Sequence, residues 1–102
     1  MYLKDLIERL EAADPEHVVR WGFSAPSSYR GYYEDVAFAP AENVTVGHML
    51  EHARAALGQT FTGYKGGEYL CRQYTDCWIA QYGTTDRAQK LGHTLLDYML
   101  QE

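Results

Sequence analysis

The segment "TVGHMLEHARAALG", from Thr45 to Gly58, limits what this chain can fold into more than any other stretch. Thr45 is a predicted N-cap, and Gly58 stands where a glycine commonly ends a helix. Between these two residues one apolar stripe recurs at helical spacing, made of Val46, Met49, Leu50, Ala53 and Leu57. Segments rich in β-branched and aromatic residues precede and follow it. The sequence therefore predicts a helix set between strands.

The first third of the chain predicts a helix and two strands. Apolar residues at helical spacing indicate a helix over about residues 2–13. Alternating residues predict one strand over residues 17–23, with Val19, Trp21 and Phe23 on one face. A loop is expected over residues 24–31, followed by a strand over residues 32–40 that Pro40 closes.

The rest of the chain predicts a hairpin over residues 60–72, a strand over residues 76–83 and a helix after Gly83. Gly92 should weaken this last helix by about 1 kcal/mol relative to alanine. Hairpin-like turns favour an antiparallel arrangement. We therefore expect a single α+β domain over residues 1–102, with a small antiparallel sheet and two to three packed helices.

Charge narrows the possible partners. The chain has 102 residues, with nine Lys+Arg against fourteen Asp+Glu and a formal net charge of -5. Long nucleic acid is not an expected partner, because such binding usually needs a broad basic face. A small anion needs only two or three well-placed cations, so it stays open.

No membrane partner is expected, because no apolar run approaches the ~20 residues of a membrane span. The first residues are amphipathic and charged and do not resemble a signal peptide, so a cytoplasmic location is expected. Cys71 and Cys77 are then expected as reduced thiols. A cross-strand disulfide stays open if residues 72–76 form a turn. A zinc site on the two cysteines is not expected, since C-x5-C is not a usual ligand spacing.

Tyrosine is the unusual count, with nine in the chain. Tyrosine suits binding surfaces and half-buried strands alike, so the count leaves both interpretations open. Two clusters combine aromatic residues with glycine and a cation. In "SSYRGYY" Arg30 lies among tyrosines. In "GYKGG" Lys65 precedes Gly66 and Gly67, whose N–H groups can form an anion-binding nest.

These clusters predict a site for an anionic, aromatic ligand. Arginine and lysine would hold phosphate, serine would donate a hydroxyl, and the aromatic rings would stack on the ligand. The predicted ligand-binding residues are Arg20, Trp21, Phe23, Ser28, Arg30, Tyr64, Lys65, Gly66, Gly67 and Trp78. Each also has a structural explanation: a solvated turn at residues 65–67, an ion pair of Arg30 with Glu34 or Asp35, and a core position for either tryptophan.

The motif "HMLEH" matches the H-x-x-E-H pattern of one class of zinc peptidase, with His48 and His52 as ligands and Glu51 as base. Helix geometry argues against that chemistry, because both histidines point away from the apolar stripe. Catalytic zinc also needs a walled pocket and a third ligand. No nucleophile elbow and no glycine-rich phosphate motif occurs. We therefore expect no enzyme, no catalytic residues, no metal and no cofactor.

The segment from Ser27 to Tyr69 is similar to small proteins of bacteriophages. The matching features are the Y-R-G-Y-Y loop, the T-V-G-x-M-L helix and the F-T-G-Y-K-G-G loop. Together they resemble the first type of Thoeris anti-defence protein, a family of phage sponges. The resemblance implies a compact α+β protein that forms dimers or higher oligomers in the cytoplasm of an infected bacterium.

The same resemblance implies a function. Such proteins bind and sequester a cyclic ADP-ribose immune signal without cleaving it, and some also hold cyclic oligonucleotides. Arg30, in its S-Y-R-G setting, is the one position that carries over as a ligand residue. The alternative is a phage accessory protein that inhibits a host protein by direct contact, with the tyrosine-rich loops as its binding surface.

Overall fold

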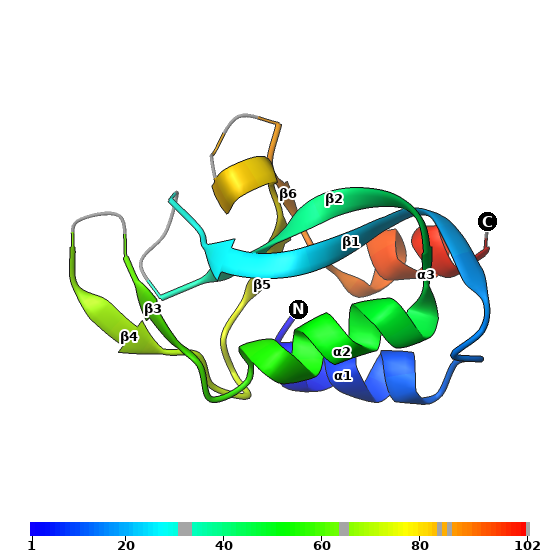
Figure 1. Cartoon of the computed structure of the whole chain (residues 1–102), viewed down its shortest axis with the longest axis horizontal. Helices are drawn as coiled ribbons and strands as arrows, with labels where there is room; N and C mark the ends of the chain where they lie inside the picture. The colour runs from blue at the N-terminus through cyan, green and yellow to red at the C-terminus, as the bar shows by residue number, and fades with distance from the viewer. Residues whose placement is uncertain (31–33, 64–65, 84, 86, 102) are drawn as a thin grey trace.

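A long, twisted pair of strands lies over the helices in Figure 1. The computed structural model describes residues 1–30, 34–63, 66–83, 85 and 87–101. Its elements, in chain order, are α1 (Leu3–Glu11), β1 (Val18–Ser28), β2 (Val36–Thr45), α2 (Val46–Ala56), β3 (Thr60–Thr62), β4 (Glu68–Leu70), β5 (Cys77–Ile79), the 3₁₀ helix η1 (Gln81–Gly83), β6 (Gln89–Lys90) and α3 (His93–Gln101). The predicted α+β fold is confirmed.

The described strands form a four-stranded sheet, in the order β1-β2-β5-β6, and a separate β3–β4 hairpin. The predicted hairpin is therefore present. The pairs β1–β2 and β5–β6 are antiparallel, but β2 and β5 run parallel. A parallel pair needs a crossover connection. Here the crossover comprises α2 and the β3–β4 hairpin. Because the hairpin follows the helix, the sequence lacks the simple strand–helix–strand pattern that would predict a parallel pair.

The first two strands are longer than the sequence predicts. β1 continues through Ser28, so most of the predicted loop over residues 24–31 is strand. Pro26 fits because β1 lies at the sheet edge and its pairing is irregular between Phe23 and Pro26. β2 likewise runs past Pro40 to Thr45. β5 pairs with β2 only as far as Phe38, so Pro40 removes no hydrogen bond from that pairing.

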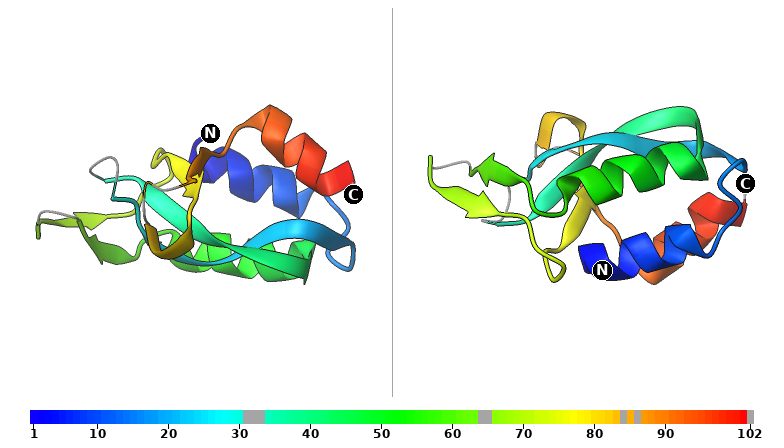
Figure 2. Two further views of the ribbon diagram at one scale, coloured as in Figure 1. Left: turned by 90° about the horizontal axis from the view of Figure 1, so that it is seen from above. Right: turned by 60° about the horizontal axis from the view of Figure 1, so that its bottom comes forward.

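The core fills the space between the sheet and the helices. Leu6 of α1, Met49 of α2 and Leu96 of α3 are fully buried in one cluster with Phe23 and Phe38 of the sheet. Figure 2 shows α1 and α3 side by side in both views. Arg9 of α1 forms an ion pair with Asp97 of α3, which joins these helices at the surface. Among the described residues, no helix is long and apolar enough to cross a membrane.

α2 begins and ends where the sequence predicts. The Thr45 hydroxyl accepts a hydrogen bond from the His48 N–H at 3.0 Å, which is an N-cap. Gly58, just past the helix, has φ +85 and donates its N–H to the Cys71 carbonyl at 2.8 Å. Of the predicted apolar stripe, Leu57 is the exception, because it lies beyond the helix and is exposed.

The last helix is shorter than predicted. Gln89 and Lys90 belong to β6, and α3 begins only at His93. Gly92 precedes the helix, and its carbonyl accepts the Leu96 N–H at 2.9 Å. The expected cost of an internal helical glycine therefore does not apply. β6 has only two residues and exists through its pairing with β5 on the other side of η1, so local periodicity could not reveal it.

Candidate functional site

A groove of about 540 Å³ opens between the sheet and α3. This volume lies within the range of roughly 300–1,000 Å³ typical of small-molecule sites. Its lining comes from six elements, β1, β2, β5, η1, β6 and α3, and the residues are Trp21, Gly22, Pro40, Ala41, Glu42, Ile79, Gln81, Gln89, Leu95, Tyr98 and Met99. Most of these side chains are apolar. The groove is therefore suited to a flat, largely apolar part of a ligand.

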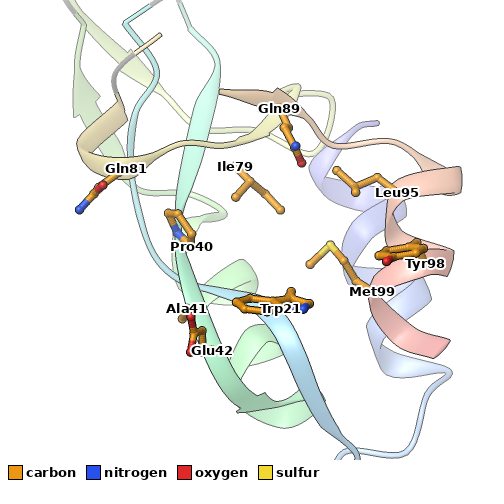
Figure 3. Close-up of a pocket in the computed structure, with 11 residues that line it drawn as sticks. Trp21, Pro40, Ala41, Glu42, Ile79, Gln81, Gln89, Leu95, Tyr98 and Met99 are labelled. Atoms are coloured by element: carbon orange, nitrogen blue, oxygen red, sulfur yellow. The ribbon is translucent and has the colours of Figure 1, made fainter. Parts of the chain in front are cut away.

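Two exposed aromatic side chains form part of the groove wall. Trp21 of β1 is 49% exposed and Tyr98 of α3 is 60% exposed, although both are large rings. Figure 3 shows them on two sides of the same space, with Met99 between them and Ile79 further along the groove. Covering a large exposed aromatic ring removes apolar surface from water, which favours binding of a ligand against it. The pair therefore presents stacking area to a ligand.

Trp21 reaches the surface, unlike the two residues with which it alternates along β1. Val19 and Phe23, two residues on either side, are fully buried in the core. Gly22 lies between Trp21 and Phe23, and a Cβ there would meet Val44 Cγ2 at 2.5 Å and Met49 Sδ at 2.9 Å. The strand therefore approaches α2 closely at Gly22. Trp21, by contrast, lines the open groove.

Charge is unevenly distributed around the groove. Glu42 is the one charged residue among its described lining residues. Arg20, the neighbour of Trp21, is exposed and places its guanidinium carbon 5.3 Å from the centre of the Trp21 ring. This is a cation–π contact. The predicted residues Arg20 and Trp21 therefore lie together, with the cation next to the aromatic wall.

Two other predicted residues, Ser28 and Trp78, belong to a separate cluster. The Tyr69 hydroxyl donates to the Asp35 carbonyl at 2.6 Å and lies 3.1 Å from the Ser28 hydroxyl oxygen. Trp78 donates its indole N–H to the Asp35 carboxylate at 2.9 Å and stacks on Tyr29 at 4.2 Å. These contacts tie the end of β1 to β4 and β5. Trp78 is thus engaged within the protein.

Asp35 is the titratable centre of this cluster. Burial raises the pKa of its carboxyl above the ordinary value, although the hydrogen bond from Trp78 opposes the shift. The nearby Asp76 carboxylate raises the pKa further. The Asp35 carboxylate lies beside the second pocket, of about 420 Å³, which Arg72, Tyr74 and Asp76 also line. That pocket is mainly polar and acidic, so it suits an anion poorly.

Phe23 and Arg30 lie apart from the groove for different reasons. Phe23 is fully buried and packs on Phe38 with ring centres 4.6 Å apart, so its ring belongs to the core. Arg30 is exposed, and its N–H donates to the Gly83 carbonyl at 2.7 Å. None of the ion pairs found among the described residues includes the Arg30 guanidinium.

The predicted nest at Gly66 and Gly67 is a hairpin turn. Gly66 has φ +89, but its N–H donates to the Gly63 carbonyl at 2.9 Å. The Gly67 carbonyl accepts the Gly63 N–H at 2.6 Å. The Gly66 N–H is thus used within the turn. The predicted residues Tyr64 and Lys65 lie outside the described residues. Figure 1 shows the hairpin projecting from the end of the molecule away from α3.

The sequence interpretation missed most of the groove. Tyr98 lies three residues after Leu95 and next to Met99, two apolar residues four positions apart in the last helix, so the sequence could have placed its ring at the edge of that helix's apolar face. For Pro40 the sequence predicts only the end of a strand, whereas the structure places it in the lining of the groove. No local signal could bring β1, β2 and α3 together, because their meeting depends on the tertiary fold.

Comparison with models of known protein families, with curated proteins and with solved structures found no match to this chain. The family resemblance therefore stays a prediction.

Proposed function

We propose that this protein is a non-catalytic binding protein that sequesters a small signal molecule with a planar ring, and that the molecule is a cyclic nucleotide of the cyclic ADP-ribose type. The observation that carries the proposal is the groove between Trp21 and Tyr98, with the Arg20 guanidinium beside its aromatic wall. A purine would enter the groove, and its phosphates would remain near Arg20.

The aromatic pair supports the base-binding part of the proposal. Stacking of a nucleobase on a protein aromatic ring contributes about 1–3 kcal/mol per base. Trp21 and Tyr98 lie on different elements, so a base between them would join the sheet to α3. Sequestration requires slow release, and burial of a ring against both side chains favours it.

The charges decide how such a ligand would be oriented. Glu42 lies in the groove and repels phosphate, whereas it can accept hydrogen bonds from the amino or N–H groups of a base. Arg20 is outside the lining and can pair with phosphate. We therefore expect the base to bind inward, against Glu42, and the phosphates outward.

The proposal places the protein in the cytoplasm of an infected bacterium, as a dimer or higher oligomer. Light scattering after gel filtration tests the oligomeric state.

Calorimetric titration with cyclic ADP-ribose and its glycocyclic isomers tests the function. We expect binding at micromolar or lower concentration, with recovery of the intact ligand after heat release. Trp21→Ala should weaken binding by roughly 1–3 kcal/mol, because one stacking surface is lost. Arg20→Ala should also weaken binding, and this loss of affinity should be larger at low salt than at high salt, because salt screens the attraction between the guanidinium and the phosphate.

Tyr74→Ala is the matched control for this experiment. Tyr74 is also a largely exposed aromatic residue, at 62% against 49% for Trp21, but it contacts Tyr2 and does not line the groove. Its replacement should leave ligand affinity unchanged. The proposal fails if no cyclic nucleotide binds, if a bound nucleotide is recovered cleaved, or if Tyr74→Ala and Trp21→Ala reduce affinity equally.

A second candidate function has its own observation. Tyr2 and Tyr74 form an exposed edge-to-face pair with ring centres 5.5 Å apart, and Leu70 beside the second pocket is also exposed. Exposed aromatic residues are common at protein interfaces. This surface fits the alternative of a protein that inhibits a host protein by direct contact. Copurification of a host protein that Tyr74→Ala abolishes and Trp21→Ala preserves would favour this alternative.

A further inference from the structure

One face of α2 carries two histidines that neither the groove nor the core uses. His48 and His52 are four residues apart, so they lie one above the other on the same side of the helix. Their ring centres are 4.6 Å apart, and their planes are inclined by 75°. Both side chains are half-buried. The helix thus holds two imidazoles in contact at the protein surface.

The backbone beneath these rings is firmly placed. His48 lies in the first turn of α2, where its N–H donates to the Thr45 cap at 3.0 Å. The same helix packs on β1 and α1 through Met49 and Ala53, both fully buried. The two histidines therefore keep their spacing without help from a ligand, which lowers the conformational cost of binding one.

The ring nitrogens of the pair are not used by the described part of the protein. No hydrogen bond or ion pair there involves a ring nitrogen of His48 or His52. His93 differs, because its Nδ1 lies 3.1 Å from Arg9 Nη1. Glu51, an exposed neighbour in sequence, adds negative charge near the pair.

Two adjacent imidazoles are a chelating unit for borderline metal ions. Metal–nitrogen bonds to histidine are about 2.0–2.1 Å, so two ligating nitrogens lie about 3 Å apart. Ring centres 4.6 Å apart allow this separation by side-chain rotation alone. Chelation by histidines at positions i and i+4 of a helix uses this geometry.

We propose that His48 and His52 form a two-imidazole surface site for a late first-row transition metal ion, which binds Cu²⁺ most tightly and Zn²⁺ and Ni²⁺ more weakly. The order follows the general preference of nitrogen ligands among these ions. Water completes the coordination. No group of three or more His, Cys, Asp or Glu residues in the described part of the chain is placed to hold a metal. The site is therefore an exchangeable chelate and not the enclosed zinc centre of a peptidase.

Calorimetric titration of tag-free protein with CuCl₂, ZnCl₂ and MgCl₂ tests the site. We expect one equivalent of Cu²⁺ to bind at micromolar concentration, Zn²⁺ to bind more weakly and Mg²⁺ not to bind. The paramagnetic resonance spectrum of the Cu²⁺ complex should show coupling to two imidazole nitrogens. His48→Ala and His52→Ala should each lower the Cu²⁺ affinity at least tenfold, since a single imidazole cannot chelate.

A spacing variant separates chelation from the mere presence of histidine. His52→Ala combined with Ala55→His keeps four histidines in the chain but moves the second ring to an exposed position two turns from His48, about 10.5 Å along the axis. This variant should bind Cu²⁺ as weakly as His52→Ala, whereas His93→Ala should bind like the unmodified protein. Full affinity in the spacing variant, or its loss in His93→Ala, would overturn the proposal. Circular dichroism checks that each variant is folded.

Discussion

At the scale of single residues, Gly83 shows how closely two segments can approach. Its φ is +71, and a Cβ at this position would lie 2.1 Å from the Ser28 carbonyl oxygen. Its own carbonyl accepts the Arg30 N–H at 2.7 Å. Glycine is needed here for two reasons, since any side chain would both strain the backbone and collide with the end of β1.

Gly83→Ala should therefore destabilise the protein by roughly 2–4 kcal/mol, from backbone strain and the steric clash together. Gly58→Ala is the matched control. Gly58 has φ +85, but nothing lies within 4 Å of its Cβ position. Only the left-handed conformation is then penalised, at about 1–2 kcal/mol. Urea denaturation measures both values. Equal losses would show that the contact with Ser28 costs nothing.

The same scale shows why the site was only partly predictable. Trp21 and Phe23 look equivalent in sequence because they alternate on one strand face. Yet Trp21 is exposed in the groove, whereas Phe23 is fully buried in the core. Trp78 is engaged by Asp35, which lies 43 positions away in the chain. Exposure and distant partners are tertiary properties, so residue type and spacing could propose these aromatics but could not sort them.

At the scale of elements, α2 was predictable because its determinants are local. Its cap, its apolar stripe and the glycine beyond its end all lie within residues 45–58. The opposite holds for β5 and β6, which are three and two residues long and exist because they pair with each other and with β2. Short strands carry little signal of their own.

The cap of α2 allows a prediction at this scale. Thr45→Ala removes the acceptor of the His48 N–H and should lower the free energy of unfolding by about 1 kcal/mol. Thr45→Ser should retain most of the stability, because serine offers the same hydroxyl. Thr62→Ala, on the exposed side of β3, is a control that removes no cap. Chemical denaturation of the three variants gives the comparison, and a neutral Thr45→Ala would contradict the prediction.

At the scale of the whole molecule, three buried groups link folding to alkaline pH. Burial raises the pKa values of Cys77, Cys71 and Tyr69 above their ordinary values. Both cysteines are free thiols and are buried, so the disulfide left open by the sequence does not form in this structure. The folded protein keeps these protons at pH values where the unfolded chain has begun to release them.

The stability that these three protonated groups contribute should therefore be fully present below pH 9.0, the ordinary cysteine pKa, and should be lost as the pH rises above it. The urea midpoint measured from about pH 7 to about pH 10.5 tests this sign. Cys77→Ala should make the alkaline decrease shallower, whatever its effect at neutral pH. A thiol reagent at neutral pH should label neither cysteine before unfolding. A flat midpoint across this range would refute the linkage.

The parallel pairing of β2 with β5 also fixes an order of events during synthesis. Phe38 of β2 can pair with Ile79 of β5 only after about 40 further residues have been synthesised. At elongation rates of roughly 5–20 residues per second, this delay is about 2–8 s. During that time β2 exposes a hydrogen-bonding edge that lies inside the sheet of the finished protein. The nascent chain thus passes through a stage in which its later interior is open to other chains.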